Sequence, residues 1–295
     1  MSTTAFVLVF AAAFAHAAWN IIAHGSSRTG LPFLWWGSLI SMLMWVGVIP
    51  FTGGFGAADL RGFLAGAGVS AVLHVAYMLV LQRGYTVGDL STVYATARGT
   101  GPMLTVLIAV LFLGERPAPL ALLGVAVLVC GIVAIGFIGR PLHTDMRTPT
   151  RKILGMDPGL FYGLVTGVAI ATYTIWDTHA LREWGATPVA FMVGCLALEI
   201  PIYTLVIWKR RGELMPTLRE QWKRLIAFGF FSPLSYILVL TAVTIAPVSL
   251  VAPVREVSVV LVSLFGAIVF KEHRPVARVA ASVVVVGGVV LLSIG

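Results

Sequence analysis

Ten stretches of about 20 mostly apolar residues dominate the sequence. A helix needs this length to cross the hydrocarbon core of a bilayer, where each backbone N–H and C=O group must be paired within the segment. The stretches lack the even alternation of membrane β-strands, and several are apolar on all sides, so helices are predicted. They cover residues 4–23, 33–52, 62–83, 90–113, 118–139, 159–180, 187–208, 225–243, 248–270 and 275–294.

The composition supports this interpretation. Hydrophobic residues make up 59% of the chain and charged residues only 11%, whereas a soluble domain carries roughly 25% charged residues. We therefore predict an all-α, multi-pass protein with ten transmembrane helices in the cell (inner) membrane. Cys130 and Cys195 lie inside apolar stretches and are expected to be small buried residues, with neither a disulfide nor a metal site.

The net charge of +8 is explained by position rather than by a nucleic-acid partner. Fifteen Lys and Arg residues fall on one side of the predicted membrane, and three, Arg61, Arg116 and Arg182, fall on the other. Positive loops stay in the cytoplasm, so this distribution places the odd-numbered loops inside and both termini outside. The lipid bilayer, and not a nucleic acid, is the expected partner.

The two halves of the sequence repeat each other. Three landmarks recur 157 positions later, Trp19 as Trp176, Arg98 as Arg255 and Glu115 as Glu272. Each half holds five predicted helices, an odd number, so the second copy enters the membrane from the opposite face. We predict two inverted five-helix repeats around a central cavity, with the first in residues 1–139, a basic linker in 140–158 and the second in 159–295.

Two pairs of glycines have the spacing of close helix packing. They are Gly62-x-x-x-Gly66 in the third stretch and Gly163-x-x-x-Gly167 in the sixth. Small residues four apart let two helices approach closely.

Ionisable side chains inside the apolar stretches need either a partner or a function, since each costs several kcal/mol at the bilayer centre. Arg98 and Arg255 lie at matching repeat positions and too deep to reach the interface, so each is either a structural ion pair or a substrate group. Arg255 and Glu256 are adjacent and would point about 100° apart on a helix, so they are not expected to face each other. Glu199 lies within the seventh stretch, either as a proton site or as a partner of a neighbouring helix.

Aromatic and polar side chains share helix faces in several stretches, a pattern typical of a small-molecule pocket. Single aromatic residues of this kind also serve as interface anchors or core. The predicted substrate-binding residues are His16, Trp19, Asn20, His74, Tyr77, Tyr94, Arg98, Tyr173, Trp176, Asp177, Tyr236 and Arg255. Asp177 could attract an ammonium group, Arg98 and Arg255 a carboxylate, and the two histidines could couple transport to protons.

No enzyme signature is present: the sequence lacks H-E-x-x-H, G-x-S-x-G and a phosphate-binding Walker loop. We therefore expect no catalytic residues, no cofactor and no metal. Glu115 and Glu272 lie at helix ends near basic neighbours and are interpreted as boundary and packing residues.

The sequence resembles the tandem EamA domains of the drug/metabolite transporter superfamily. The matching features are Trp19 and Trp176 together with Gly114-Glu115-Arg116-Pro117 and Lys271-Glu272-His273-Arg274-Pro275. Within that superfamily it is most similar to bacterial amino-acid exporters of the YddG type. The resemblance implies a basket of ten helices whose cavity is lined by helices 1, 3, 4, 6, 8 and 9.

The expected function is export of small metabolites, above all neutral or aromatic amino acids, by alternating access. The alternative is proton-coupled efflux of lipophilic cations, which would need a cavity carboxylate such as Asp177, Glu199 or Glu256. Sugar phosphates, a membrane-embedded enzyme and a structural scaffold fit the residues less well. Substrate, direction, coupling ion and oligomeric state are left open by the sequence.

The orientation is directly testable. A reporter that is active only in the cytoplasm should be inactive when fused after residue 295, because the positive loops place that end outside. The same reporter fused after a truncation within 140–152 should be active. Activity of the C-terminal fusion would contradict the predicted orientation.

Overall fold

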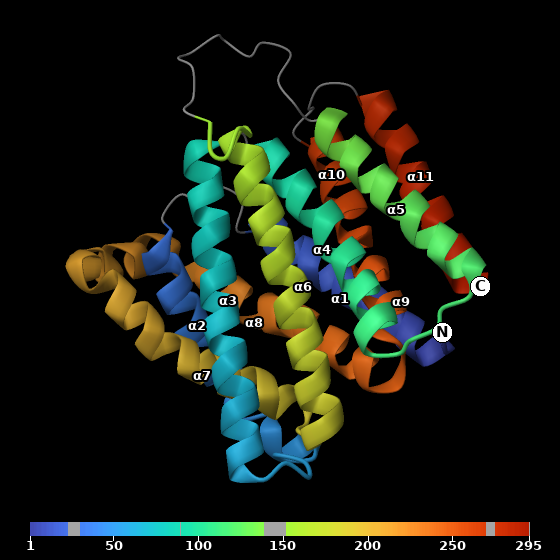
Figure 1. Ribbon diagram of the computed structural model, residues 1–295. Coiled ribbons are helices and arrows are strands. Elements are labelled where there is room, and N and C mark those ends of the chain that lie inside the picture. The colour runs from blue at the N-terminus through green and yellow to red at the C-terminus, as the bar shows by residue number, and fades with distance from the viewer. Residues whose placement is uncertain (23–29, 89, 139–151, 270–274, 295) are drawn as a thin grey trace. The chain divides into compact units, whose positions relative to one another are not determined.

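The computed structural model describes residues 1–22, 30–88, 90–138, 152–269 and 275–294, and these are almost entirely helical (Figure 1). The only bridge between extended residues in these ranges joins Ile153 and Met156. The helices are α1 (Thr3–Ile22), α2 (Leu31–Val46), α3 (Leu60–Val87), α4 (Leu90–Phe112), α5 (Pro119–Ile138), α6 (Pro158–Trp184), α7 (Pro188–Ile207), α8 (Leu214–Ile245), α9 (Val248–Arg255), α10 (Val257–Val269) and α11 (Pro275–Ile294). Two short 3₁₀ helices, η2 (Ile49–Thr52) and η3 (Trp208–Glu213), follow α2 and α7.

Every apolar stretch predicted from the sequence contains a helix. Two of them differ in detail, since α8 begins about eleven residues before the predicted 225–243, and 248–270 is divided into α9 and α10. By length and composition, five helical segments of the described chain could cross a membrane: Thr3–Ile22, Leu60–Val87, Thr92–Phe112, Pro158–Trp184 and the continuous Pro188–Ile245. Leu31–Val46, Pro119–Ile135 and Val279–Leu292 are apolar but shorter. The ten spans and the inverted repeat stay predictions.

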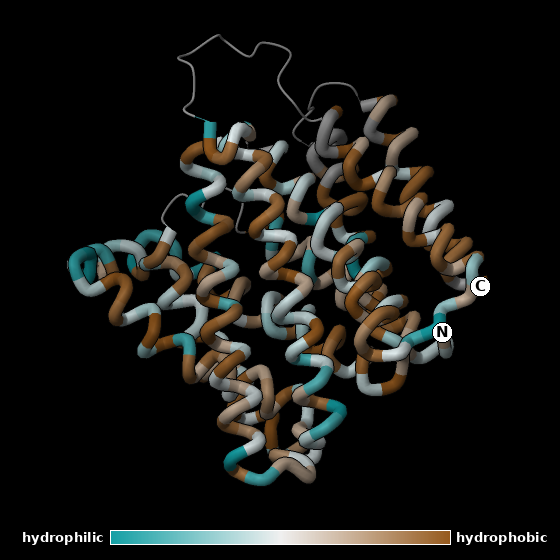
Figure 2. Tube along the Cα trace, in the orientation of Figure 1, coloured by the Kyte–Doolittle hydropathy of each residue, from teal (hydrophilic) through white to brown (hydrophobic). Residues whose placement is uncertain are grey.

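Apolar residues predominate along most helices, as the brown colour of Figure 2 shows. Leu107, Leu111, Val168 and Val283 are among many large apolar side chains with more than half of their surface exposed. A soluble protein rarely exposes so much apolar surface, whereas a bilayer accommodates it.

The chain forms two compact units, and each unit combines segments from both halves of the sequence. Unit 1 contains Ala76–Ile175 and Pro247–Gly295, together with Met1, and unit 2 contains Ser2–Val75 and Trp176–Ala246. Helices α3 and α6 contribute to both units. The predicted linker, 140–158, lies for the most part outside the described residues, and the repeat boundaries stay a prediction.

In unit 1, small residues bring helices into backbone contact. Helix α5 packs along α11 (Figure 1), and a Cβ atom placed on Gly288 would lie 2.5 Å from the backbone nitrogen of Leu128. The predicted pair on α6 behaves in the same way. A Cβ on Gly163 would lie 2.7 Å from Cβ of Thr96, and one on Gly167 would lie 2.6 Å from Cβ of Thr100. The packing role predicted for these two glycines is confirmed.

In unit 2, α8 packs against α1 and α2, and α2 packs against α7. Phe33, Leu225 and Phe228 form a buried cluster there, with Trp19 packed against it. On α3, a Cβ placed on Gly66 would lie 2.9 Å from the ring of Trp184, so the second predicted glycine pair also marks a helix contact.

Close packing of α5 and α11 should make Gly288 intolerant of a side chain. Gly288→Ala forces a methyl group into the backbone of α5, and overpacking of this kind costs about 1–3 kcal/mol. The neighbouring Gly287 has no atom within 4 Å of a built Cβ. Gly287→Ala should therefore leave the midpoint of thermal unfolding in detergent unchanged or raise it, since alanine favours the helix. Equal midpoints for the two variants would contradict the backbone contact.

Candidate functional site

Unit 1 buries three charged side chains in contact with one another. Nη1 of Arg98, on α4, donates to both carboxylate oxygens of Glu256 at 3.2 Å, and Nε of Arg255 lies 3.5 Å from Oε1 of Glu256. Glu256 has no exposed surface, and each arginine has only 5% exposed. Two guanidinium groups thus share one carboxylate.

The contact between Arg255 and Glu256 corrects the expectation that these neighbours point apart. Helix α9 ends at Arg255 and α10 begins at Val257, so Glu256 lies at an interruption. Pro253 has no N–H to donate and weakens the helix one turn earlier. The chain then tightens, because Glu256 N–H donates to the carbonyl of Pro253 at 3.0 Å, three residues back. The interruption lets adjacent side chains reach the same place.

Glu115 holds the beginning of α9. Its two carboxylate oxygens accept from the backbone N–H groups of Val248 and Ser249, each at 2.9 Å. A carboxylate at this position satisfies unpaired N–H groups and complements the positive end of the helix dipole. The predicted role of Glu115 at a helix boundary is confirmed, whereas Glu272 lies outside the described residues.

Aromatic rings accompany the charged residues of unit 1. The guanidinium of Arg98 lies 5.3 Å from the ring centroid of Tyr94, a cation–π distance. The rings of Tyr77 and Tyr173 meet edge to face, with centroids 5.4 Å apart. Each predicted binding residue of unit 1 therefore contacts either a ring or a charged partner. These residues are Tyr77, Tyr94, Arg98, Tyr173 and Arg255.

Unit 2 gathers a second polar cluster around Asp177 of α6. His74, on α3, donates through Nε2 to Oδ2 of Asp177 at 3.2 Å, and the hydroxyl of Tyr236, on α8, donates to the same oxygen. Asp177 is fully buried, and its other oxygen, Oδ1, has no hydrogen-bond partner among the described residues. The three predicted residues thus form one site, with one acceptor still available.

Trp176 and the residues of α1 have local roles in unit 2. Nε1 of Trp176 donates to the carbonyl of Gly66 at 3.0 Å. The rings of His16 and Trp19 meet at 5.0 Å, and the amide of Asn20 donates to the carbonyl of His16 at 2.7 Å. These contacts show Trp176 tying α6 to α3, and the amide of Asn20 bonded within its own helix.

Cys195 and Ser70 were missed as site residues, whereas Glu199 was expected to be either a proton site or a partner of a neighbouring helix, and it does contact Ser38 of α2. Glu199 of α7 accepts from Ser38 at 2.7 Å and from the thiol of Cys195 at 3.6 Å, and Ser70 lies 3.5 Å from that sulfur. The sequence did contain a signal, because Cys195 and Glu199 are four apart, as are Ser70 and His74, so each pair shares a helix face. Cys195 is buried as predicted, but Cys130 is exposed on α5, which corrects that expectation.

Comparison with known proteins supports a transporter. Residues 157–294 match the EamA-like transporter family. This similarity covers somewhat less than half of the chain, and it agrees with a likeness to the drug/metabolite transporter superfamily. Together with the apolar helices, it supports an integral, multi-pass membrane protein.

A solved structure, titled only "Crystal structure of protein", is similar over 100% of this chain and 98% of its own length. Its TM-score is 0.73 and its sequence identity 16%, so the likeness concerns the fold alone. No curated protein matches the sequence.

Loss of the buried carboxylate of Glu256 should lower the stability of the fold far more than loss of an exposed carboxylate. Glu256→Gln leaves two buried guanidinium groups without their shared counter-charge, and breaking a buried pair costs about 3–5 kcal/mol. Glu213→Gln removes a comparable partner of Arg210 at the surface, where about half of each side chain is exposed. Thermal unfolding in detergent should show a large loss for Glu256→Gln and no measurable change for Glu213→Gln. A similar small effect for both would show that the unit 1 contact is dispensable.

Proposed function

We propose that the protein is a secondary transporter of the cell membrane that exports small metabolites, most notably neutral or aromatic amino acids, by alternating access. The EamA-like domain supports transport of a small solute. The duplicated landmarks of the sequence support the inverted repeat on which alternating access commonly depends. The observation that carries the substrate class is the cluster of Arg98, Arg255 and Glu256.

This cluster favours an anion. Two guanidinium groups meet at one carboxylate, and all three side chains are almost entirely buried. A charge withdrawn from water is costly unless a counter-charge approaches it. The planar fork of an arginine matches a carboxylate in geometry and charge, so a carboxylate substrate is the simplest complement.

The rings near the arginines suit a partly apolar substrate. Tyr94 lies beside the guanidinium of Arg98, and Tyr77 packs against Tyr173. Small-molecule sites combine aromatic walls with a few polar groups that fix orientation. A neutral or aromatic amino acid supplies both a carboxylate and an apolar side chain.

The cluster of unit 2 has the opposite preference. Oδ1 of Asp177 is buried and has no hydrogen-bond partner among the described residues, while Oδ2 accepts from His74 and Tyr236. An ammonium group would satisfy that oxygen.

One alternative is favoured by specific residues. Asp177 and Glu199 are buried carboxyl groups on either side of His74, as proton-coupled efflux of lipophilic cations would require. The buried arginines argue against a cationic substrate, because they repel it. Protons remain the proposed coupling ion for either substrate.

Transport by purified protein in liposomes separates these candidates. We expect uptake of phenylalanine or leucine into proteoliposomes, and at least about tenfold slower uptake of the corresponding amides, since a charged hydrogen bond contributes about 1.5–3 kcal/mol. Arg98→Gln should lower amino-acid transport by a similar factor, while the surface variant Arg210→Gln should not. The unfolding midpoint of each variant, measured in detergent, separates loss of transport from loss of folding.

Two other results would contradict the proposed amino-acid substrate. Equal transport of an amino acid and its amide would exclude carboxylate recognition by the arginine cluster. Transport of a quaternary ammonium compound driven by a proton gradient, without amino-acid transport, would establish the alternative.

A further inference from the structure

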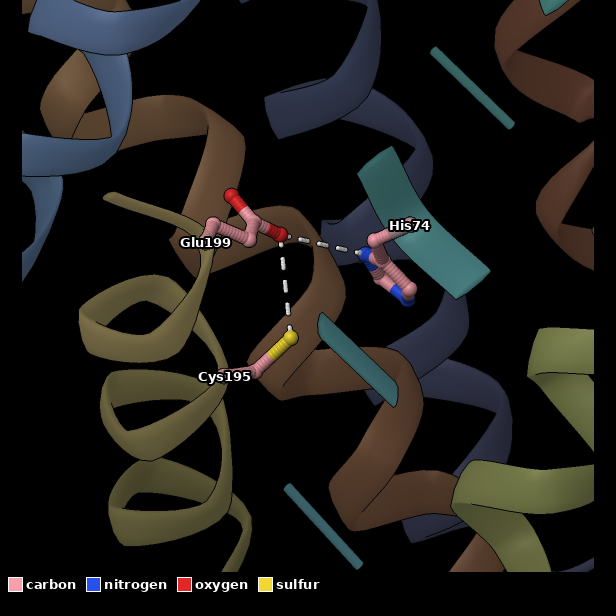
Figure 3. Close-up of side chains that lie close together, drawn as sticks. All are labelled: His74, Cys195 and Glu199. Carbon is pink, nitrogen blue, oxygen red and sulfur yellow. Dashed lines mark hydrogen bonds and ion pairs between the residues drawn. The ribbon is translucent and has the colours of Figure 1, made fainter. Parts of the chain in front are cut away.

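Within unit 2, three side chains with metal-binding atoms converge from two helices. Nδ1 of His74, on α3, lies 3.8 Å from Oε1 of Glu199, and the sulfur of Cys195 lies 3.6 Å from the same oxygen. The three atoms lie within 4.8 Å of one another, and Figure 3 shows the side chains pointing toward a common place. Cys195 and Glu199 are buried, and the side chain of His74 is only 14% exposed.

The orientation of His74 leaves an electron pair directed at Glu199. Its Nε2 donates to Asp177, so in the neutral ring Nδ1 is an acceptor. Nδ1 and the carboxylate oxygen of Glu199 are then two acceptors facing each other. Their separation of 3.8 Å is longer than a hydrogen bond. A cation between them could bind both atoms.

The second nitrogen of His74 has the partner that a metal-bound histidine needs. A ligating histidine almost always donates its other N–H to a carboxylate or carbonyl, which fixes the ring and raises its basicity. Asp177 supplies that carboxylate at 3.2 Å and is itself held by the hydroxyl of Tyr236.

The other two side chains are supported in the same manner. Oε2 of Glu199 accepts from Ser38 at 2.7 Å, which leaves Oε1 directed at His74 and Cys195. The hydroxyl of Ser70 lies 3.5 Å from the sulfur of Cys195 and can donate to a thiolate. Each of the three candidate ligands therefore has its own outer partner.

We propose that this cluster binds one divalent transition-metal ion of the zinc class, through Nδ1 of His74, the sulfur of Cys195 and Oε1 of Glu199. Zinc bonds of about 2.0–2.3 Å at tetrahedral angles separate ligand atoms by roughly 3.3–3.6 Å. The separations of 3.6 and 3.8 Å are close to that geometry, and the third pair of ligand atoms, which lies within 4.8 Å, would close as the ion binds. Sulfur and imidazole donors select zinc, cobalt or a similar ion over magnesium and calcium, which prefer oxygen.

The ion would fasten α3 to α7 within unit 2. Cys195 and Glu199 lie one helical turn apart on α7, and His74 is contributed by α3. Binding to the folded state alone would raise stability by mass action. The metal site shares His74 with the proposed amino-acid site, but Cys195 and Glu199 do not belong to that site, and metal binding is measured without the substrate.

Cobalt provides the test, because its spectrum reports a bound thiolate. Full-length protein without a polyhistidine tag, purified in detergent and stripped with a chelator, is titrated with Co²⁺ and separately with Zn²⁺. We expect one ion per chain, a sulfur-to-cobalt charge-transfer band with the visible bands of tetrahedral Co²⁺, and a higher unfolding midpoint with Zn²⁺. Cys195→Ser should abolish the charge-transfer band, while the matched Cys130→Ser should retain it.

Further variants address the outer partners and folding. Glu199→Gln should remove tight binding, and Ser70→Ala should weaken it by about 10- to 100-fold, as loss of outer partners does in other metal sites. The unfolding midpoint of each metal-free variant, compared with that of the metal-free parent, shows whether it is folded.

Three results would overturn the proposal. They are a cobalt spectrum that Cys195→Ser leaves unchanged, the absence of a bound ion in the folded parent protein, and a Zn²⁺ effect that persists in Glu199→Gln. The second result would show that the three side chains pack together without a metal ion. Transport of amino acids, or its failure, alters none of these measurements.

Discussion

The shortage of water around buried charges is the constraint on which this structure depends. In a chain this apolar, an ionised side chain needs a counter-charge or hydrogen-bond donors supplied by the protein. Unit 1 meets the requirement by placing Arg98 and Arg255 on the single carboxylate of Glu256. Unit 2 meets it by placing His74 between the carboxyl groups of Asp177 and Glu199.

Irregular backbone and small residues make these arrangements possible. The interruption at Glu256 gives two adjacent side chains access to the same place, and Glu115 secures the beginning of the short helix before it. Elsewhere, glycines such as Gly163 and Gly288 bring helices close enough for backbone contact. Without a hydrophobic driving force between helices in lipid, this close packing supplies much of the association energy.

Much of the fold follows from the sequence, because apolar length and glycine spacing are local properties. Helices fall within all ten predicted stretches, and the glycines at 62, 66, 163 and 167 make the expected contacts. The pairing of Arg98 with Glu256 could not be read in the same way, since it joins residues 158 positions apart. The reach of Arg255 to Glu256 depends on a helix interruption that hydropathy does not reveal.

Only part of the site was predicted, because the sequence shows which residues share a helix face but not which faces meet. Aromatic and ionisable residues on shared faces marked His74, Asp177 and Tyr236, which do meet. Cys195 was interpreted as a small apolar residue because it lies inside an apolar stretch. The structure shows that its thiol contacts Glu199 one turn along α7 and Ser70 on α3. The spacing of four in each helix was visible, but which two faces meet was not.

The buried charged clusters connect stability to occupancy under the two proposals. The proposed substrate carboxylate would bind at the guanidinium groups of unit 1, and the proposed cation at the acceptors of unit 2. A ligand that contacts such a cluster binds more tightly to the conformation in which the cluster is assembled. Alternating access requires that difference, because a ligand shifts a conformational equilibrium only by its differential affinity for the two states. Buried charged clusters of this kind are therefore well suited to couple binding to movement.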